Sequence, residues 1–148
     1  MSSAGSMAER VEPRLRVLIV DDDRDIRMLM RLVLENDRQL IVVGEAEDGF
    51  DAIEQARRLR PGGVVLDLNM PRLDGCQAAD AILNDCPETV VVMFTSAPPA
   101  PASTPHPTIM KASPNWAERL AVTLVDLAGR SAVDWPAWER RGRDRSAG

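Results

Sequence analysis

Short runs of apolar residues alternate along this chain with longer segments in which apolar residues recur every three or four positions. A short apolar run bounded by polar residues is typical of a buried β-strand, and the longer spacing is typical of an amphipathic helix. The pattern predicts five strands, at residues 17–20, 40–44, 64–66, 90–94 and 108–110. Helical patterns follow all of them except the fourth, so we expect an α/β fold with a parallel sheet.

The helix predicted after the first strand has an apolar stripe and a charged face. We assign to its core stripe Ile26, Leu29, Met30, Val33 and Leu34. We expect the opposite face to carry Arg24, Arg27, Arg31 and Glu35. Met28 and Leu32 fall outside the core stripe and are framed by these charges. An exposed apolar spot of this kind is typical of a protein contact surface, so both residues are partner-binding candidates.

Proline interrupts the alternation between the fourth and fifth strands. The eleven residues 97–107 include five prolines: Pro98, Pro99, Pro101, Pro105 and Pro107. Proline inside a helix costs about 3 kcal/mol, so we expect an extended, polyproline-like loop here and no helix. The last helix is predicted to begin beyond the fifth strand, with Ser113 as its cap and Pro114 in its first turn.

Acidic residues follow two of the predicted strands. Asp21 and Asp22 come directly after the first strand, and Asp67 follows the third. The carboxyl ends of parallel strands meet at one edge of a sheet, so these three carboxylates should lie together in one crevice. Carboxylates at such close range repel each other strongly unless a cation lies among them. The pattern therefore predicts a divalent metal ion at this edge.

Hydroxyl and ammonium groups follow the remaining strands. Thr95 and Ser96 end the fourth strand, and Lys111, the one lysine among eighteen basic residues, ends the fifth. A carboxylate nucleophile, a metal ion, a hydroxyl and an ammonium group are the equipment for phosphoryl transfer, because that reaction needs positioning and charge neutralisation.

Composition limits the other functions. A length of 148 residues suits one folded domain, which we place at 15–129, between a flexible leader (1–14) and a C-terminal tail (130–148). The formal net charge of −5 argues against direct binding to nucleic acid. No signal sequence and no run near the roughly 18 apolar residues of a membrane span is found, so we expect a cytoplasmic protein without membrane contact.

These motifs together resemble the receiver domain of two-component response regulators. The resemblance covers about residues 15–129 and depends on Asp21-Asp22, residues 46–49, residues 67–71 with Asp74-Gly75, Thr95-Ser96, and Lys111. It implies a flavodoxin-like, doubly wound sheet of five parallel strands in the order 2-1-3-4-5, of the kind found in chemotaxis receivers. In this chain the usual fourth helix would be replaced by the proline-rich loop.

The resemblance also implies a magnesium site. Asp22, Asp67 and the backbone carbonyl of Asn69 would bind Mg²⁺ directly, and Asp21 would act through a water molecule. Hard oxygen ligands with several retained waters suit this ion.

Asp67 would be the phosphoacceptor, receiving a phosphoryl group from a sensor histidine kinase or a phosphotransfer protein. The Thr95 hydroxyl and the Lys111 ammonium would contact the phosphoryl oxygens, with help from the Ser96 backbone amide. We expect a stand-alone regulator that signals to an unknown downstream protein by direct contact. It would not be an enzyme beyond slow self-catalysed phosphotransfer and dephosphorylation.

Two alternatives remain open at this stage. Receivers commonly carry Tyr or Phe three positions before the lysine, where this chain has Thr108, so the domain could be a protein-binding module that works without phosphorylation. More distantly, Asp21-Asp22-Asp23 offers the Asp-x-Asp pattern of haloacid dehalogenase phosphatases. Against that reading, Asp25 stands where Thr or Val is usual, and the chain has no room for a cap domain.

Overall fold

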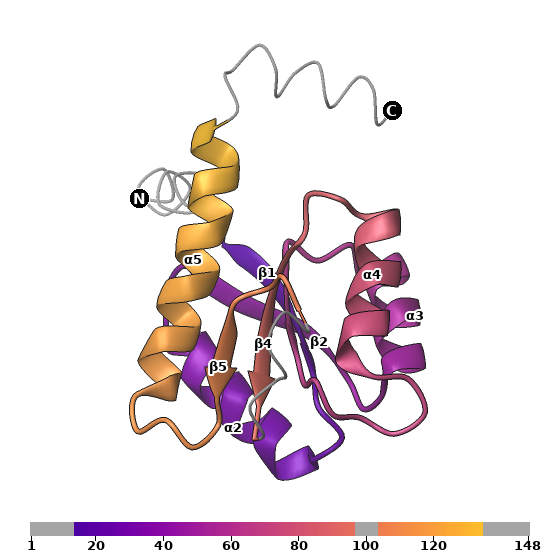
Figure 1. Ribbon diagram of the computed structural model, residues 1–148. Helices are drawn as coiled ribbons and strands as arrows, with labels where there is room; N and C mark the ends of the chain where they lie inside the picture. Colours follow the sequence, from indigo (N-terminus) through magenta and orange to yellow (C-terminus); the bar gives the residue numbers. More distant parts are fainter. Residues whose placement is uncertain (1–13, 97–103, 135–148) are drawn as a thin grey trace, which may run out of the picture.

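A five-stranded parallel sheet runs through the middle of the protein (Figure 1). The computed structural model describes residues 14–96 and 104–134. The strands are β1 (Leu15–Val20), β2 (Leu40–Ala46), β3 (Gly63–Leu66), β4 (Val90–Thr95) and β5 (Thr108–Met110). They pair in the order β2-β1-β3-β4-β5, every pair parallel, which confirms the predicted flavodoxin-like fold.

Helices cover both faces of this sheet. They are α2 (Arg24–Glu35), α3 (Gly49–Leu59), α4 (Gly75–Asp85) and α5 (Trp116–Asp134). In Figure 1, α2 and α5 lie on one side of the sheet and α3 and α4 on the other. An aspartate caps the N-terminus of three helices: Asp23 for α2, Asp48 for α3 and Asp74 for α4. Such a carboxylate accepts bonds from backbone amides that the first helical turn leaves unpaired.

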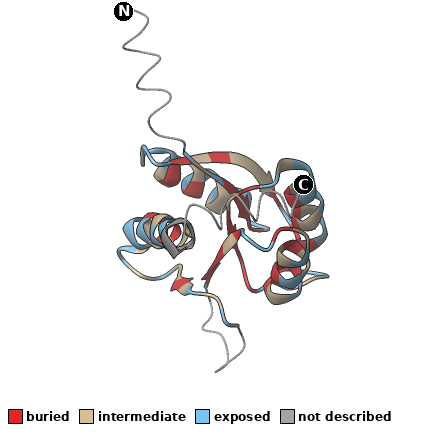
Figure 2. Cartoon of the chain, turned by 90° about the horizontal axis from the view of Figure 1, so that it is seen from above, coloured by how far each residue is buried: buried red, intermediate tan, exposed pale blue. Residues whose placement is uncertain are grey.

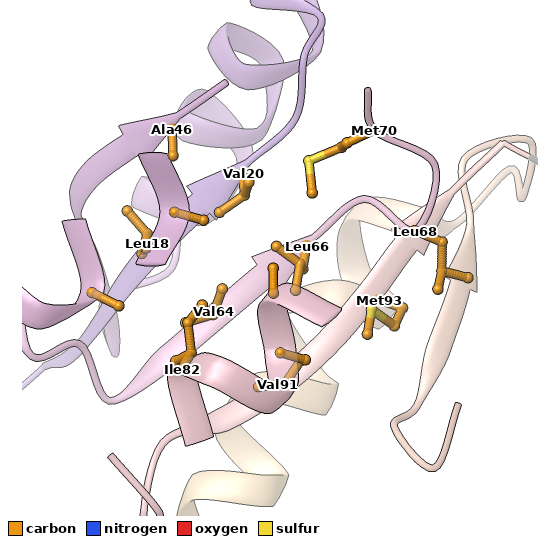
Figure 3. Packing of buried hydrophobic residues seen from close by; sticks show 14 residues of the cluster. Leu18, Val20, Ala46, Val64, Leu66, Leu68, Met70, Ile82, Val91 and Met93 are labelled. Atoms are coloured by element: carbon orange, nitrogen blue, oxygen red, sulfur yellow. The ribbon is translucent and has the colours of Figure 1, made fainter. Parts of the chain in front are cut away.

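Two apolar cores result, one on each face, because successive side chains of a strand point to opposite sides. Leu18 and Val20 of β1 pack toward α3 and α4, in the cluster drawn in Figure 3. Val17 and Ile19 pack toward α2 and α5, together with Leu120 and Leu124. Both sets are fully buried, and Figure 2 shows the buried residues concentrated in the strands and the inner faces of the helices.

A β-bulge changes which face the end of β2 presents. Val17 pairs with Val42, but Leu18 pairs with Gly44, so Val43 is an extra residue on β2. Before the bulge, Val42 belongs to the core under α2 and α5. After it, Gly44 lies against Leu59 of α3. The extra residue reverses the alternation of faces, as bulges do.

Three sequence-based expectations about elements are wrong. The helical spacing predicts Leu29 in the core stripe, yet this residue is exposed, and Met30 and Leu34 are the buried residues of α2. β2 runs two residues past Gly44, because the bulge lets it continue pairing with β1. The last helix begins at Trp116, and Ser113 and Pro114 instead form a turn closed by the Trp116 N–H to the Ser113 carbonyl at 3.2 Å.

The prediction about the proline-rich segment falls mostly on residues 97–103, which lie outside the described residues. Of the predicted loop 97–107 the structure describes residues 104–107, and these are not helical. The predicted leader (1–14) and tail (130–148) also fall largely on residues that are not described. In the described ranges, no helix combines the length and apolar character required to cross a membrane.

Candidate functional site

The carboxyl ends of four strands bring the predicted site residues to one edge of the sheet. Asp67 follows β3, and its amide donates to the Val20 carbonyl of β1 at 3.1 Å. Thr95 ends β4, and its carbonyl accepts the Lys111 amide at 2.7 Å. Asp21 follows β1 and binds the Ala46 carbonyl of β2 through its amide at 3.1 Å. The ladder bonds that hold the sheet together therefore also fix the site.

Lys111 joins two of the acids. Its Nζ lies 2.6 Å from Asp21 Oδ2 and 3.2 Å from Asp67 Oδ2. Asp21 and Asp67 are both buried, so the ammonium group neutralises carboxylates that water barely reaches. Burial lowers the pKa of Lys111, but its pairing with the two carboxylates outweighs this, and the net pKa is raised. Lys111 is therefore charged at neutral pH.

Asp21 is the most constrained member of the cluster. Its side chain is fully buried, and Oδ1 accepts the Asp23 amide at 2.9 Å. Burial raises the pKa of this carboxyl group, against the opposing effect of Lys111. With Oδ2 turned to Lys111, the side chain is held in place by its own protein contacts.

Asp22 completes the cluster as its exposed member. One carboxylate oxygen from each of Asp21, Asp22 and Asp67 lies within 4.8 Å of the others. Three carboxylates at this range are hard oxygen donors grouped closely enough to share one small divalent cation, and Lys111 alone does not balance their charge. The residues present therefore fit the predicted metal ion.

The loop between β3 and α4 closes the site. The Asn69 amide donates to Asp67 Oδ1 at 3.1 Å, and Asn69 Nδ2 donates to Thr95 Oγ1 at 3.2 Å. Asn69 thus links the carboxylate to the buried hydroxyl of the neighbouring strand. Gly75 makes this loop tight, because a Cβ there would overlap the Asp67 carbonyl oxygen and lie 2.8 Å from Leu68 Cα. Ser96 follows Thr95 at the same edge and is exposed.

An aromatic pair, Phe94 and Trp116, begins beside the ammonium group. Lys111 Nζ lies 5.7 Å from the centre of the Phe94 ring, which suits a cation–π contact. The Phe94 ring in turn packs against Trp116 of α5, with 5.0 Å between ring centres. The site is thereby connected to the first turn of the last helix.

The partner-binding candidates lie on the outer surface of α2. Met28 is 51% exposed and Leu32 is 67% exposed. Leu29, at 44%, adds to them. We call these three residues the α2 apolar patch. Exposed apolar side chains that cluster on one helix are typical of protein contact sites.

A polar network next to the site does not follow from the sequence pattern. The helical spacing predicts Arg27 and Arg31 on the solvent face of α2, yet both bind Glu45, through Arg27 Nε at 3.0 Å and Arg31 Nε at 2.9 Å. Arg27 Nη1 also donates to the Asp21 carbonyl at 2.7 Å. The bulge at Val43 brings Glu45 to the α2 side of the sheet, and no sequence pattern indicates that bulge.

A second missed contact lies between α3 and the β3–α4 loop. Arg72, in a left-handed backbone conformation with φ of 72°, forms an ion pair with Asp48 and lies over the exposed Phe50 ring. The Asp51 amide and Arg72 lower the pKa of Asp48, against the effect of burial.

Comparison with known proteins identifies this architecture. Residues 17–103 match the family model described as the response regulator receiver domain. The chain belongs to this family. Receiver domains are signalling domains that generally bind Mg²⁺ through a cluster of acids and interact with histidine kinases and downstream proteins. The match to the receiver family therefore argues against the alternative of a haloacid dehalogenase phosphatase.

Among solved structures, this receiver is similar to the response regulator domain of CheB from Thermotoga maritima, with a TM-score of 0.66 and 27% identity over 80% of this chain and 96% of that one. It is also similar to the receiver domain of AraT, a response regulator from Geobacillus stearothermophilus, with a TM-score of 0.70 and 25% identity over 82% and 98% of the two chains.

Curated relatives include longer proteins. The receiver is 42% identical over 89 residues to protein-glutamate methylesterase/protein-glutamine glutaminase 1 of Geobacter sulfurreducens, a match that covers 60% of this chain and 25% of the relative. A Myxococcus xanthus protein of the same name, numbered 4, is 44% identical over 81 residues, which are 55% of this chain and 23% of the relative. The matches therefore span about a quarter of these relatives, whose names describe whole proteins.

Proposed function

We propose that this receiver accepts a phosphoryl group on Asp67 from a phosphohistidine donor and signals through protein contact. The observation that carries the proposal is the pairing of one ammonium group, on Lys111, with the buried carboxylates of Asp21 and Asp67. The Thr95 hydroxyl is linked to Asp67 through Asn69. Burying charged groups costs free energy even when they are paired, so a set of this kind at a strand end is better explained by function than by stability.

In the proposed reaction, a carboxylate oxygen of Asp67 attacks phosphorus while the bond from phosphorus to the donor nitrogen breaks. The imidazole nitrogen keeps that electron pair and takes up a proton, and the product is an acyl phosphate. Lys111 moves its charge from the carboxylate toward a phosphoryl oxygen, and the Thr95 hydroxyl donates to another. Asn69, which contacts both Asp67 and Thr95, keeps the two groups in register.

Asp22, Asp67 and the Asn69 backbone carbonyl are the residues proposed to hold Mg²⁺, with Asp21 acting through a water molecule. When bound, the ion would neutralise charge on the transferred oxygens. The contacts of Asp21 support the indirect role, because its two oxygens are already engaged by the Asp23 amide and by Lys111.

The direct test is phosphorylation with acetyl phosphate and Mg²⁺, followed by intact mass. We expect one added phosphoryl group on the wild type and none on Asp67→Asn. Thr95→Ala should be phosphorylated and then differ from the wild type in the lifetime of the adduct. An unmodified wild type would reject the proposal and favour a protein-binding module that works without phosphorylation, for which the lack of an aromatic residue at Thr108 is the supporting feature.

The proposed docking surface for the kinase or phosphotransfer protein is the α2 apolar patch, with Met28 and Leu32 at its centre. The double substitution Met28→Asp, Leu32→Asp should slow phosphotransfer from a cognate kinase and leave phosphorylation by acetyl phosphate unchanged. Loss of both reactions would indicate misfolding, and loss of neither would exclude the patch.

A further inference from the structure

A guanidinium group connects α2 to the backbone of the acid cluster. Arg27 Nη1 donates to the Asp21 carbonyl at 2.7 Å, and Arg27 Nε donates to Glu45 Oε1 at 3.0 Å. The Arg27 side chain is only 16% exposed, so water competes weakly for these bonds. The planar guanidinium thus uses two donors to tie the end of β1 to β2.

Both backbone groups of Asp21 are connected to the end of β2, the amide directly and the carbonyl through Arg27. Its amide binds the Ala46 carbonyl at 3.1 Å. Its carbonyl binds Arg27, which in turn binds Glu45, the residue before Ala46. This arrangement exists because the bulge at Val43 places Glu45 on the α2 side.

A hydrogen bond to the Asp21 carbonyl also fixes the orientation of the Asp22 amide. The Asp21 carbonyl and the Asp22 amide belong to one planar peptide group. Asp22 is the exposed acid of the cluster, and within the described ranges no hydrogen bond or ion pair holds its carboxylate. The direction of that carboxylate therefore depends on the orientation of its backbone.

We propose that Arg27, held by Glu45, is a positioning residue for the magnesium site. It orients the Asp21–Asp22 peptide so that the Asp22 carboxylate faces the other two acids. The inference rests on the proposed function, since it concerns the affinity of the same site. Glu45 balances the charge of Arg27, so the pair orients the acids without an uncompensated positive charge next to a bound cation.

Arg31 supplies a matched control. It lies one turn further along α2 and also binds Glu45, through Nε to Oε2 at 2.9 Å, with a second ion pair to Glu35 at 3.4 Å. Among the residues that the structure describes, Arg31 contacts Glu45 and Glu35 and no member of the acid cluster. Arg31→Met and Arg27→Met therefore both remove an ion pair with Glu45, but only Arg27→Met releases the Asp21 carbonyl.

The experiment is a calorimetric titration of the full chain with magnesium chloride. We expect the dissociation constant to rise about tenfold in Arg27→Met, the size of effect seen when an outer contact of a metal site is removed. Arg31→Met should keep about the wild-type value. In the absence of Mg²⁺, the Asp22 amide signal in an NMR spectrum should move in Arg27→Met and stay in place in Arg31→Met. Equal behaviour of the two variants would overturn the inference.

A second variant covers the case in which Arg27→Met does not fold. Arg27→Lys keeps the charge but has a single ammonium group in place of the fork, so it should weaken Mg²⁺ binding by a smaller factor. Wild-type affinity in a folded Arg27→Lys protein would overturn the inference. If the wild type itself binds no Mg²⁺, the proposed function fails. If it binds and both Arg27 variants bind equally well, only the role of Arg27 fails.

Discussion

At the scale of single residues, Lys111 decides whether the site is stable. Its ammonium group contacts Asp21 and Asp67, and both acids are buried. Removing one partner of a buried ion pair leaves a charge without compensation and costs several kcal/mol. The fold therefore tolerates these buried acids, since the Lys111 ammonium group contacts both of them.

We expect Lys111→Met to lower the free energy of unfolding by about 2 kcal/mol at pH 7, since the half-buried lysine leaves some access for water. Added Mg²⁺ should recover more stability in this variant than in the wild type, because a metal ion then compensates the same carboxylates. Urea unfolding with and without Mg²⁺ measures both effects. Lys111→Arg, which keeps the charge, is the control, and a Lys111→Met protein as stable as the wild type would contradict the argument.

Glu45 gives a prediction about pH. Burial raises its pKa, but hydrogen bonds from Arg31 and Arg27 outweigh this and lower the net value below the ordinary 4.5. A folded-state pKa below the unfolded one means that Glu45 stabilises the fold fully above about pH 4.5, and that this contribution is lost as the pH falls through the lower, folded value.

Glu45→Gln should therefore be less stable than the wild type by about 1 kcal/mol at pH 7, and the difference should vanish in acid. Urea unfolding across this pH range measures it. Glu35→Gln serves as the comparison: in the described part of the chain Glu35 pairs with Arg31 alone, and because this pair is exposed the substitution should change stability little. A difference for Glu45→Gln that persists below the folded pKa would be inconsistent with this pairing.

At the scale of elements, loops and bulges set the geometry of the site. Gly75 allows the β3–α4 loop to pass directly over the Asp67 backbone. Gly129 lies in α5, where, apart from the helix's own backbone, no atom of the described residues comes within 4 Å of an added Cβ. The same substitution should therefore have opposite effects at the two positions.

We expect Gly75→Ala to destabilise the fold by about 2 kcal/mol, since the loop must shift to remove the overlap. Gly129→Ala should stabilise the fold by up to about 1 kcal/mol, because alanine has a higher helix propensity than glycine at an exposed helix position. Thermal unfolding of both variants measures the change in melting temperature. Equal changes at the two positions would show that the β3–α4 loop can accommodate a Cβ at Gly75.

The elements also show what sequence can and cannot predict. The strands and the acids at their ends follow from apolar runs and from the motifs around Asp67 and Lys111, because both are linear patterns. The order of the strands is implied by the resemblance to receiver domains that these motifs carry. The pairing of Arg27 with Glu45 does not, since one extra residue at Val43 reverses the faces of β2. Leu29 likewise matches the helical spacing of the core, and only the position of the sheet leaves it exposed.

At the scale of the whole molecule, the sheet separates two cores. Ile82 belongs to the cluster under α3 and α4, and Ile109 to the cluster under α2 and α5. Both side chains are almost completely buried. Because the two clusters have no member in common among the described residues, we expect damage to one core to leave the energetics of the other unchanged.

We expect Ile82→Val and Ile109→Val each to cost about 1 kcal/mol, and the double variant to cost the sum to within about 0.5 kcal/mol. Urea unfolding of the four proteins completes the cycle. A coupling energy well above that margin would show that strain passes from one core to the other through the strands.

The contact between Phe94 and Trp116 has a practical consequence. The indole of Trp116 packs at a tilt against the Phe94 ring, and Lys111 Nζ lies over that same ring, so we expect a movement of the ammonium group to change the surroundings and the emission of Trp116. With Trp135 and Trp138 replaced by Phe, unlabelled protein would report in real time, as a change in fluorescence, each event that draws the lysine toward a new anion.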